Sequence, residues 1–211
     1  MSTWIHHFGL ARHPFTKDID DDALWLPTAK RALVDELLDA LAARDSVVLT
    51  GEPGVGKTCV LRALRHGLPP QGFRLTYCHN ATLGRRDFYR QLCQALGLSP
   101  KATAAALFHA VGGHVHELAN ARVHPVFLLD EAHMLHPDVL AHLHILLNYE
   151  WDSRALLSVV LVGLPELRDR LSLTLHKPLF SRLHTRLEIL PASLDDSAEY
   201  LRFRLRRVGC E

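Results

Sequence analysis

The 211 residues predict an α/β fold in which helices flank a five-stranded parallel sheet. Three observations predict it. A glycine-rich loop at residues 51–58 lies between a strand-type run and a helix-type run. Strand-length apolar segments alternate with amphipathic segments of helix length along the chain. The run that ends at Asp130 is apolar up to that residue, as in a parallel strand that is covered on both faces.

The elements of the first half follow from leucine spacing and from alternation. Leu33, Leu37 and Leu41 recur on one face of a helix, and Phe73 and Leu75 alternate with polar residues along a strand. In chain order, these patterns predict a helix over 29–43, a strand over 46–50, a helix over 59–65, a strand over 73–78, and helices over 85–96 and 102–119.

The second half continues the alternation. Its strands are apolar runs, its first helix has an apolar face that includes Val139 and Leu143, and its last helix opens on the capping-box pattern of residues 193–196. These patterns predict strands over 125–130, 156–162 and 186–190, and helices over 137–149, from Pro165 onward, and from 193 to about 207.

The composition narrows the class of protein. A net charge of +1 excludes a generally basic surface, so nucleic-acid binding would need local patches. No apolar run is long enough for a transmembrane helix, and the N-terminus lacks the pattern of a signal peptide. The cysteines form no Cys-x-x-Cys pair, which indicates reduced thiols of a cytoplasmic protein. The spacing of His133, His136, His142 and His144 matches no usual metal-ligand pattern.

Residues 51–58 read Gly-Glu-Pro-Gly-Val-Gly-Lys-Thr, a complete Walker A phosphate loop. Its glycines let the backbone curl so that successive N–H groups point at phosphate oxygens, and the next helix adds its positive N-terminal end. We expect Lys57 to reach the β- and γ-phosphates of ATP, and the Thr58 hydroxyl to bind Mg²⁺. The predicted nucleotide-binding residues are Gly51, Glu52, Pro53, Gly54, Val55, Gly56, Lys57, Thr58 and Cys59, together with Asp130 farther along the chain.

The apolar run before Asp130 and Glu131 has the Walker B pattern. Such a strand ends at the carboxyl edge of the sheet, where ligands bind in α/β folds. We expect Asp130 to complete the magnesium site with Thr58, and Glu131 to orient and polarise the attacking water. A turn that caps a helix is the alternative interpretation of the two carboxylates. The phosphate loop upstream favours the nucleotide site.

These motifs and the segments around them resemble the ExeA-type AAA+ ATPases, which are similar to transposition ATPases of the TnsC, TniB and MuB kind. The resemblance covers essentially the whole chain. It is carried by Phe8-Gly9-Leu10, Pro14-Phe15, the phosphate loop, Leu129-Asp130-Glu131-Ala132-His133, Leu161-Val162-Gly163-Leu164-Pro165-Glu166-Leu167, Ser181-Arg182-Leu183 and Arg186. The opening segment and the stretch from Leu161 to Leu167 are more specific than the two Walker motifs.

The resemblance implies a division of the chain into three parts. Residues 1–27 would be a nucleotide-associated segment, 28–191 the AAA+ core, and 192–211 the start of a helical lid that is truncated here. Within the first part, Phe15 and Leu24-Trp25-Leu26 would lie near the adenine.

The resemblance also implies residue roles beyond the Walker motifs. Arg182 would be the arginine finger that reaches the γ-phosphate bound to a neighbouring subunit in a homo-oligomer, with a surface salt bridge as the alternative. Leu164 stands where ExeA-type members often have glutamine, so a polar sensor of the γ-phosphate is expected to be missing.

The resemblance leads to three candidate functions. The favoured one is an ATP-dependent ATPase that oligomerises as a ring or filament on duplex DNA and recruits a transposase, with no membrane partner. An ExeA-type secretion ATPase is one alternative; that resemblance implies a membrane segment and a cell-wall-binding domain after the ATPase, and neither occurs in the 211 residues. A slow nucleotide-binding switch with little turnover is the other.

The sequence evidence for DNA binding comes from a few local arginines. In the related transposition ATPases the segment around Thr82, Arg85 and Arg86 faces the central DNA, and these side chains would bind phosphates without reading bases. Exposed arginines at an ordinary helix start are the alternative, although arginine there runs against the helix dipole. The last helix is expected to carry a solvated arginine face, which could instead approach nucleotide or DNA: Arg202, Arg204, Arg206 and Arg207.

Overall fold

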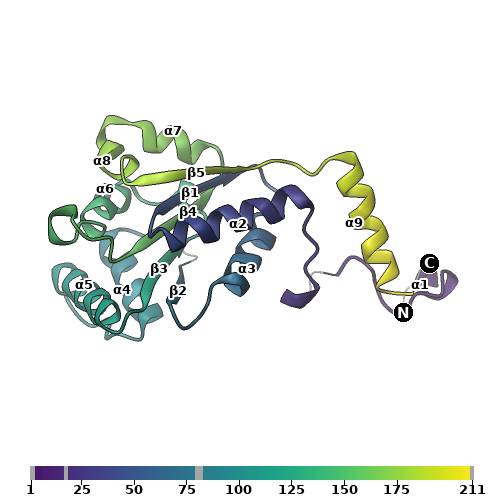
Figure 1. Ribbon diagram of the computed structural model, residues 1–211, viewed down its shortest axis with the longest axis horizontal. Coiled ribbons are helices and arrows are strands. Elements are labelled where there is room, and N and C mark those ends of the chain that lie inside the picture. Colours follow the sequence, from purple (N-terminus) through teal and green to yellow (C-terminus); the bar gives the residue numbers. More distant parts are fainter. Residues whose placement is uncertain (1–2, 17–18, 79–82, 210–211) are drawn as a thin grey trace.

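The computed structural model describes residues 3–16, 19–78 and 83–209, and it confirms the predicted fold class. The five strands of the sheet are all parallel and lie in the order β2-β3-β4-β1-β5 (Figure 1). They are β1 (Ser46–Gly51), β2 (Phe73–Cys78), β3 (His124–Leu129), β4 (Ser158–Gly163) and β5 (Leu183–Ile189). Strand β1 therefore lies between β4 and β5, whereas β2, the next strand in sequence, forms the far edge.

The helices alternate with these strands along the chain. They are α1 (Thr3–His7), α2 (Thr28–Ala42), α3 (Lys57–Gly67), α4 (Arg85–Leu96), α5 (Ala104–Asn120), α6 (Pro137–Leu146), α7 (Glu166–Ser172), α8 (Lys177–Phe180) and α9 (Leu194–Arg206). Four short 3₁₀ turns complete the described structure: η1 (Asp21–Ala23), η2 (Ala132–Met134), η3 (Glu150–Asp152) and η4 (Thr174–His176).

Two hydrophobic clusters cover the two faces of the sheet. Helices α2 and α3 pack on one face, which receives Val126 and Leu128 of β3. Helices α4 to α8 pack on the other, which receives Phe127 and Leu129. Successive residues of a strand point to opposite faces, so a central strand between two helical layers must be apolar at every position. This explains the unbroken apolar run before Asp130.

Element boundaries differ from the prediction where a local pattern is weak. Helix α5 begins at Ala104 because the Thr103 side chain accepts a hydrogen bond from the backbone N–H of Ala106 at 3.3 Å. Strand β5 begins at Leu183, earlier than predicted, since Leu183 is buried and pairs with Ser46 of β1. The polar residues that follow Leu183 hide this start in the sequence. Helices as short as α1 and α8 leave no periodicity to detect.

The N-terminal residues and α9 pack together to one side of the sheet (Figure 1). We call residues 3–16, 19–26 and 194–209 the terminal unit. Arg204 holds it together: the side chain is buried, with Nε 2.6 Å from the carbonyl oxygen of Pro14 and a terminal nitrogen 2.9 Å from that of Thr16. The backbone N–H of Ala11 donates to the carbonyl of Val208 at 2.9 Å. The expectation of a solvated arginine face was therefore wrong for Arg204, which is 6% exposed.

One carboxylate links the terminal unit to the sheet. Asp21 pairs with Arg62 at 2.6 Å and with Arg65 at 2.5 Å, and both arginines belong to α3, the helix that follows the phosphate loop. Hydrogen bonds from Arg65 and Arg62 lower the pKa of Asp21. The terminal unit is thus tied to the nucleotide-binding part of the core through α3.

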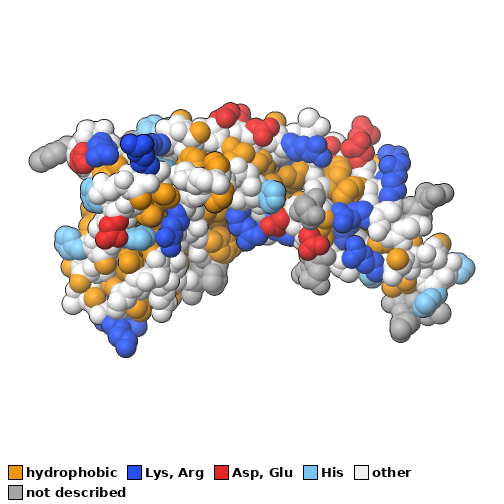
Figure 2. Space-filling model, turned by 60° about the horizontal axis from the view of Figure 1, so that its bottom comes forward, with side chains coloured by type: hydrophobic (Ala, Val, Ile, Leu, Met, Phe, Trp, Pro, Cys, Tyr) orange, Lys and Arg blue, Asp and Glu red, His pale blue; other side chains and the backbone are white. Residues whose placement is uncertain are grey.

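The space-filling view shows the surface between the sheet and the terminal unit. The surface is hollowed between the body of the sheet and the terminal unit, and Lys and Arg side chains gather over the latter (Figure 2). Within the described residues, no helix combines the length and the apolar character that crossing a bilayer requires.

Candidate nucleotide site

The phosphate loop joins β1 to α3 at the carboxyl edge of the sheet. Gly54 and Gly56 have φ angles of 80° and 96°, a region that residues with a Cβ rarely adopt. A Cβ added to Gly51 would meet the carbonyl oxygen of Ile189 at 2.9 Å, so this position also requires glycine. A Cβ on Gly54 would meet no described atom within 4 Å. The loop is therefore curled, with open space over Gly54, as phosphate binding requires.

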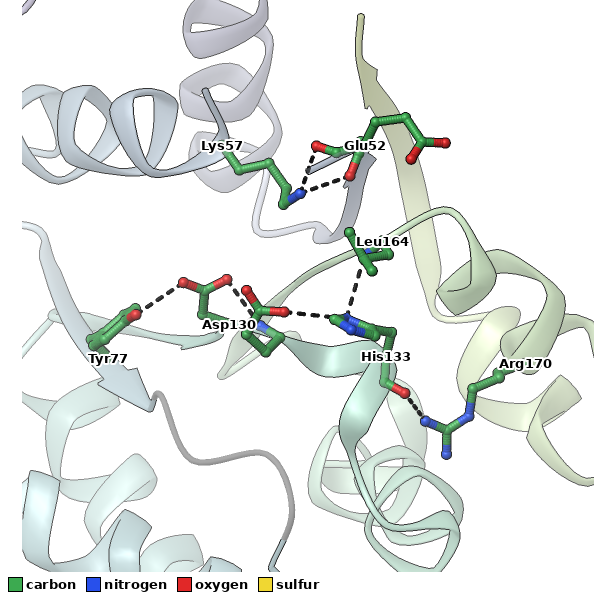
Figure 3. A network of polar contacts seen from close by, with 9 residues as sticks. Glu52, Lys57, Tyr77, Asp130, His133, Leu164 and Arg170 are labelled. Carbon is green, nitrogen blue, oxygen red and sulfur yellow. Dashed lines mark hydrogen bonds and ion pairs between the residues drawn. The ribbon is translucent and has the colours of Figure 1, made fainter. Parts of the chain in front are cut away.

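Lys57 is the first residue of α3 and folds back over the loop. Its ammonium donates to the carbonyl oxygens of Gly51 at 2.7 Å and Glu52 at 3.0 Å (Figure 3). These carbonyls are weak partners that phosphate oxygens can replace. Thr58 follows on the first turn of the helix and is exposed, so its hydroxyl is accessible to a ligand.

A second lysine, which sequence reasoning missed, contacts the loop. Lys30 of α2 donates a hydrogen bond from Nζ to the carbonyl oxygen of Val55 at 2.5 Å. The sequence places Lys30 on a helix but gives no sign of which loop that helix crosses. The long-range packing of α2 against α3 brings it to the site.

Asp130 and Glu131 lie at the end of β3, separated from β1 by β4. Two strand spacings of about 4.8 Å place the ends of β3 and β1 about 10 Å apart, with the end of β4 between them. The Tyr77 hydroxyl donates to Asp130 at 2.9 Å, and the backbone N–H of Glu131 donates to the same carboxylate at 2.9 Å (Figure 3). Partial burial and the hydrogen bond to Asp130 raise the pKa of Tyr77 to about 12.

Glu131 occupies a strained backbone position. Its φ of 54° is in the left-handed region, which costs a residue with a side chain about 1–3 kcal/mol. The side chain is 55% exposed, and it projects beside His133 rather than into the core. Strain of this kind concentrates where a side chain must be presented to a ligand.

His133 joins Glu131 to the end of β4. Its Nδ1 lies 3.5 Å from the Glu131 carboxylate and 3.4 Å from the backbone nitrogen of Leu164, the residue in the expected sensor position. Arg170 of α7 holds the same turn by donating to the carbonyl of His133 (Figure 3) and to that of Leu135. The sequence grouped His133 with the neighbouring histidines. In the structure, His133 is distinguished from those histidines because its ring lies beside Glu131, the predicted base.

A hollow of about 390 Å³ opens between the phosphate loop and the terminal unit. The Trp25 and Tyr200 rings, 5.6 Å apart, lie on its wall. Its lining also includes Lys30, Gly54, Gly56 and Cys59. Trp25 and Leu26 thus lie beside the loop, but Phe15 does not line this hollow; it is 45% exposed and contacts the His13 ring.

Arg182 lies at the opposite end of the sheet from the phosphate loop. It directly precedes β5, whose first residue pairs with Ser46 at the start of β1, whereas the loop begins where β1 ends. Five steps of about 3.3 Å along β1 separate the two ends by about 17 Å. Arg182 pairs with Asp152 at 2.5 Å and donates to the Pro178 carbonyl at 2.9 Å. The salt bridge that was the alternative interpretation is therefore present.

The predicted DNA-contacting residues are only partly described. Thr82 lies outside the described residues. Arg85 and Arg86 are exposed on the first turn of α4. Among the described residues, neither side chain makes a hydrogen bond or ion pair. They lie beyond the carboxyl end of β2, so they share the phosphate-loop edge of the sheet.

Comparison with known proteins supports part of this interpretation. A family model described as an AAA domain matches residues 40–171. The chain is 35% identical over 210 residues to General secretion pathway protein A of Aeromonas hydrophila, a match that covers 98% of this chain and 38% of that protein. The chain thus spans well under half of that relative's length.

The solved structures that share the fold include two that illustrate the likeness. Cdc6p from Pyrobaculum aerophilum matches with a TM-score of 0.63 at 20% identity, over 90% of this chain and 54% of that chain. The Aeropyrum pernix ORC1 protein, solved in complex with DNA, matches with a TM-score of 0.62 at 19% identity, over 87% of this chain and 50% of that chain. At these identities the likeness concerns the fold alone.

These findings support the ExeA-type resemblance and do not show one to transposition ATPases. The family model spans more than half of the chain and includes the phosphate loop, Asp130 and Glu131. The chain therefore belongs to the AAA domain family, and it is a P-loop ATPase.

Proposed function

We propose that this chain is the ATPase part of a secretion-type assembly, in which subunits bind and hydrolyse ATP at sites that they share. The observation that carries this proposal is the 35% identity to a general secretion pathway protein across 98% of the chain. That relative is longer, so the lack of a membrane segment or cell-wall-binding domain in the 211 residues no longer argues against a secretion role.

The residues at the carboxyl edge fit a nucleoside triphosphate with magnesium. The open, glycine-lined loop accommodates phosphates, and Lys57 exchanges the loop carbonyls for phosphate oxygens. Thr58 and Asp130 would hold Mg²⁺, which when bound neutralises charge on the β- and γ-phosphates. Glu131 accepts a proton from the attacking water, and His133 and the backbone of Leu164 fix the space around that carboxylate.

Hydrolysis in this proposal requires a second copy of the chain. Arg182 is at the amino end of β5, about 17 Å along the sheet from the loop of its own subunit, so it cannot reach that subunit's phosphates. It is available to a neighbour whose loop faces this edge. The ion pair with Asp152 is partly exposed, and such pairs contribute only about 0–1 kcal/mol, so it can open when the subunits assemble.

A domain exchange tests the proposed function. The matching part of the Aeromonas hydrophila protein is replaced with this chain, and secretion is measured in cells that lack the native protein. We expect secretion to be restored in part. The matched control carries Lys57→Ala in the same chimera and should not restore it. A chimera that accumulates and hydrolyses ATP, yet secretes no more than the control, contradicts the secretion role.

Regulation of transposition on duplex DNA is a second proposal, supported by the exposed Arg85 and Arg86 at the start of α4. It requires ATP-dependent binding to duplex DNA with little sequence preference, and recruitment of a transposase. The Arg85→Ala/Arg86→Ala variant should then weaken binding to all sequences alike and flatten its salt dependence, while ATP binding stays intact. Wild-type protein that binds no duplex DNA at low salt, with an ATP analogue present, contradicts this second proposal.

A further inference from the structure

Arginines line the amino edge of the sheet, opposite the nucleotide site. Four neighbouring strands, β3, β4, β1 and β5, are each preceded within four residues by an arginine. In sheet order these are Arg122, Arg154, Arg44 and Arg182. Strands lie about 4.8 Å apart, so the backbones that carry this row span about 14 Å. We call these four residues the amino-edge row.

Two of these arginines occupy the same unusual backbone position. Helices α2 and α5 each end in a turn whose next residue is left-handed: φ is 63° at Arg44 and 59° at Arg122. The following N–H groups close both turns, Asp45 onto the carbonyl of Ala40 and Val123 onto that of Leu118, each at 2.9 Å. Glycine is the usual residue at this position because a side chain is disfavoured there. The fold thus places two guanidinium groups at one edge in spite of the local backbone cost.

A favourable helix dipole is the competing explanation for a cation at a helix C-terminus. It does not account for the surroundings of the two side chains. A hollow of about 440 Å³ is lined by Arg44, Arg122 and Arg154, and no carboxylate residue lines it. Among the described residues, neither Arg44 nor Arg122 forms a hydrogen bond or ion pair through its guanidinium. Both are exposed.

The nearby carboxylates leave a local excess of positive charge. Glu150 pairs with Arg154 at 3.0 Å, and Asp152 pairs with Arg182 at 2.5 Å. Asp45 is 3.5 Å from the exposed His184. Arg44 and Arg122 therefore have no carboxylate partner of their own in the described structure.

The floor of the hollow is partly apolar and aromatic. Phe73 and the buried His124 lie in its lining, with their ring centroids 6.0 Å apart and nearly perpendicular, and Leu156 lies beside them. A site for a simple inorganic anion needs no such floor. Arginines above an apolar, aromatic floor suit a ligand that alternates anionic groups with flat, weakly polar ones.

We propose that Arg44, Arg122 and Arg154 of the amino-edge row bind the phosphodiester backbone of a nucleic-acid strand, at a site separate from the ATP site. These three arginines bind phosphates in the hollow, whereas Arg182 lies outside the hollow and keeps the arginine-finger role proposed above. Binding is insensitive to base sequence, because guanidinium contacts to phosphate carry no base information. This inference is independent of the proposed secretion role.

The backbone geometry supplies a selective variant. Arg44→Gly/Arg122→Gly removes two guanidinium groups and places glycine where both turns favour it, so the melting temperature should stay close to that of the wild type. The matched control, Arg202→Ala/Arg206→Ala, removes the same charge from exposed positions on α9. Binding is measured by fluorescence anisotropy with labelled single-stranded and duplex DNA of random sequence, with the ATP site saturated by a slow ATP analogue.

The expected result is that the wild type and the α9 control bind single-stranded or duplex DNA at low salt, while the glycine variant binds at least about tenfold more weakly. Its slope of log affinity against log salt should be smaller by about 1.4 for single strands or about 1.8 for duplex, because two phosphate contacts are lost. ATP hydrolysis should be unchanged.

Four results would overturn the proposal. The first is absence of DNA binding by the wild type, and the second is wild-type affinity and salt slope in the glycine variant. The third is that polyglutamate displaces labelled DNA as effectively as unlabelled DNA does, which would indicate that the row binds an acidic protein instead. The fourth is loss of ATP-dependent oligomerisation in the glycine variant with DNA binding intact, which would assign the row to the contact between subunits.

Discussion

The ammonium of Lys30 lies 2.5 Å from the carbonyl oxygen of Val55, so helix α2 holds the phosphate loop with a lysine of its own. Lys30 also lines the hollow between the loop and the terminal unit. A cation at this place orders the loop and adds to the positive potential that a triphosphate meets. We therefore infer that Lys30 takes part in nucleotide binding beside Lys57.

Lys30→Met should test that inference, since methionine keeps much of the side chain and removes the charge. A hydrogen bond to a charged group contributes about 1.5–3 kcal/mol, so we expect affinity for ATP and ADP to fall at least about tenfold in titration calorimetry. Lys177→Met, an exposed lysine on α8, is the control and should bind normally. Equal affinity of Lys30→Met and the wild type would show that Lys30 only packs against the loop.

Lys57→Ala should abolish nucleotide binding. Lys57 is the cation placed by the loop itself, and its present partners are backbone carbonyls that a phosphate replaces. Binding is measured with a fluorescent ATP analogue, and the circular dichroism spectrum serves as the folding control. If the folded variant kept near-normal affinity, the phosphate-loop assignment would be wrong.

Glu131→Gln should retain ATP but hydrolyse it about 10²–10⁴ times more slowly, the usual contribution of a general base. Glutamine preserves the size of the side chain at this strained position, and Asp130 is untouched. Single-turnover hydrolysis with radiolabelled ATP separates the chemical step from binding. Unchanged turnover in the variant, beside an active wild type, would exclude Glu131 as the base.

Arg182→Ala should slow hydrolysis only in the assembled state, because the phosphate loop of the same subunit lies at the far end of β1 from Arg182. Arginine fingers contribute about 10³–10⁵ in rate where they have been measured. Mixing Arg182→Ala subunits with Lys57→Ala subunits should restore part of the activity, since one variant offers an intact site and the other an intact finger. Absence of recovery at every mixing ratio, with assembly preserved, would make Arg182 a structural residue that holds Asp152.

Acid should destabilise the protein through His124. Burial, together with the charge of Arg44, lowers the pKa of His124 to about 4 from 6.5. Between these values the unfolded chain binds a proton that the folded chain does not, so the free energy of unfolding decreases as the pH falls from about 6.5 toward 4. The upper bound of this loss is about 3 kcal/mol.

Denaturant titrations over this pH range check the prediction for His124. His124→Gln keeps a hydrogen-bonding group near the Ser158 hydroxyl, which lies 2.8 Å from Nε2, and should flatten the pH dependence. His184→Gln, at an exposed position, is the control and should follow the wild type. Parallel pH curves for His124→Gln and the wild type would contradict the assignment.

The sequence predicts the phosphate loop and the sheet well because both depend on local pattern. The glycines at 54 and 56, the lysine at 57 and the strand before them act within a few residues of one another. The apolar run before Asp130 follows from burial on both faces of the sheet. Motif and periodicity therefore suffice for the fold class and for the two Walker motifs.

The contacts that surround these motifs could not be predicted, because they join residues far apart in the chain. Lys30 reaches Val55 across 25 positions, and Tyr77 reaches Asp130 across 53. Arg204 is an exposed residue by helical periodicity, but carbonyls 190 and 188 positions away bury it. Each depends on how helices and loops pack in three dimensions, which a single sequence does not specify.

The bonds of Arg204 also couple the early part of the chain to its last helix. Pro14 and Thr16 are fixed to α9 by one guanidinium, and Ala11 is joined to Val208. The early and late parts of the chain therefore form one packed body, the terminal unit. It is bound to α3 by Asp21 and joined to β5 by residues 190–193. We therefore expect a ligand that enters the hollow beside Trp25 and Tyr200 to displace both parts together.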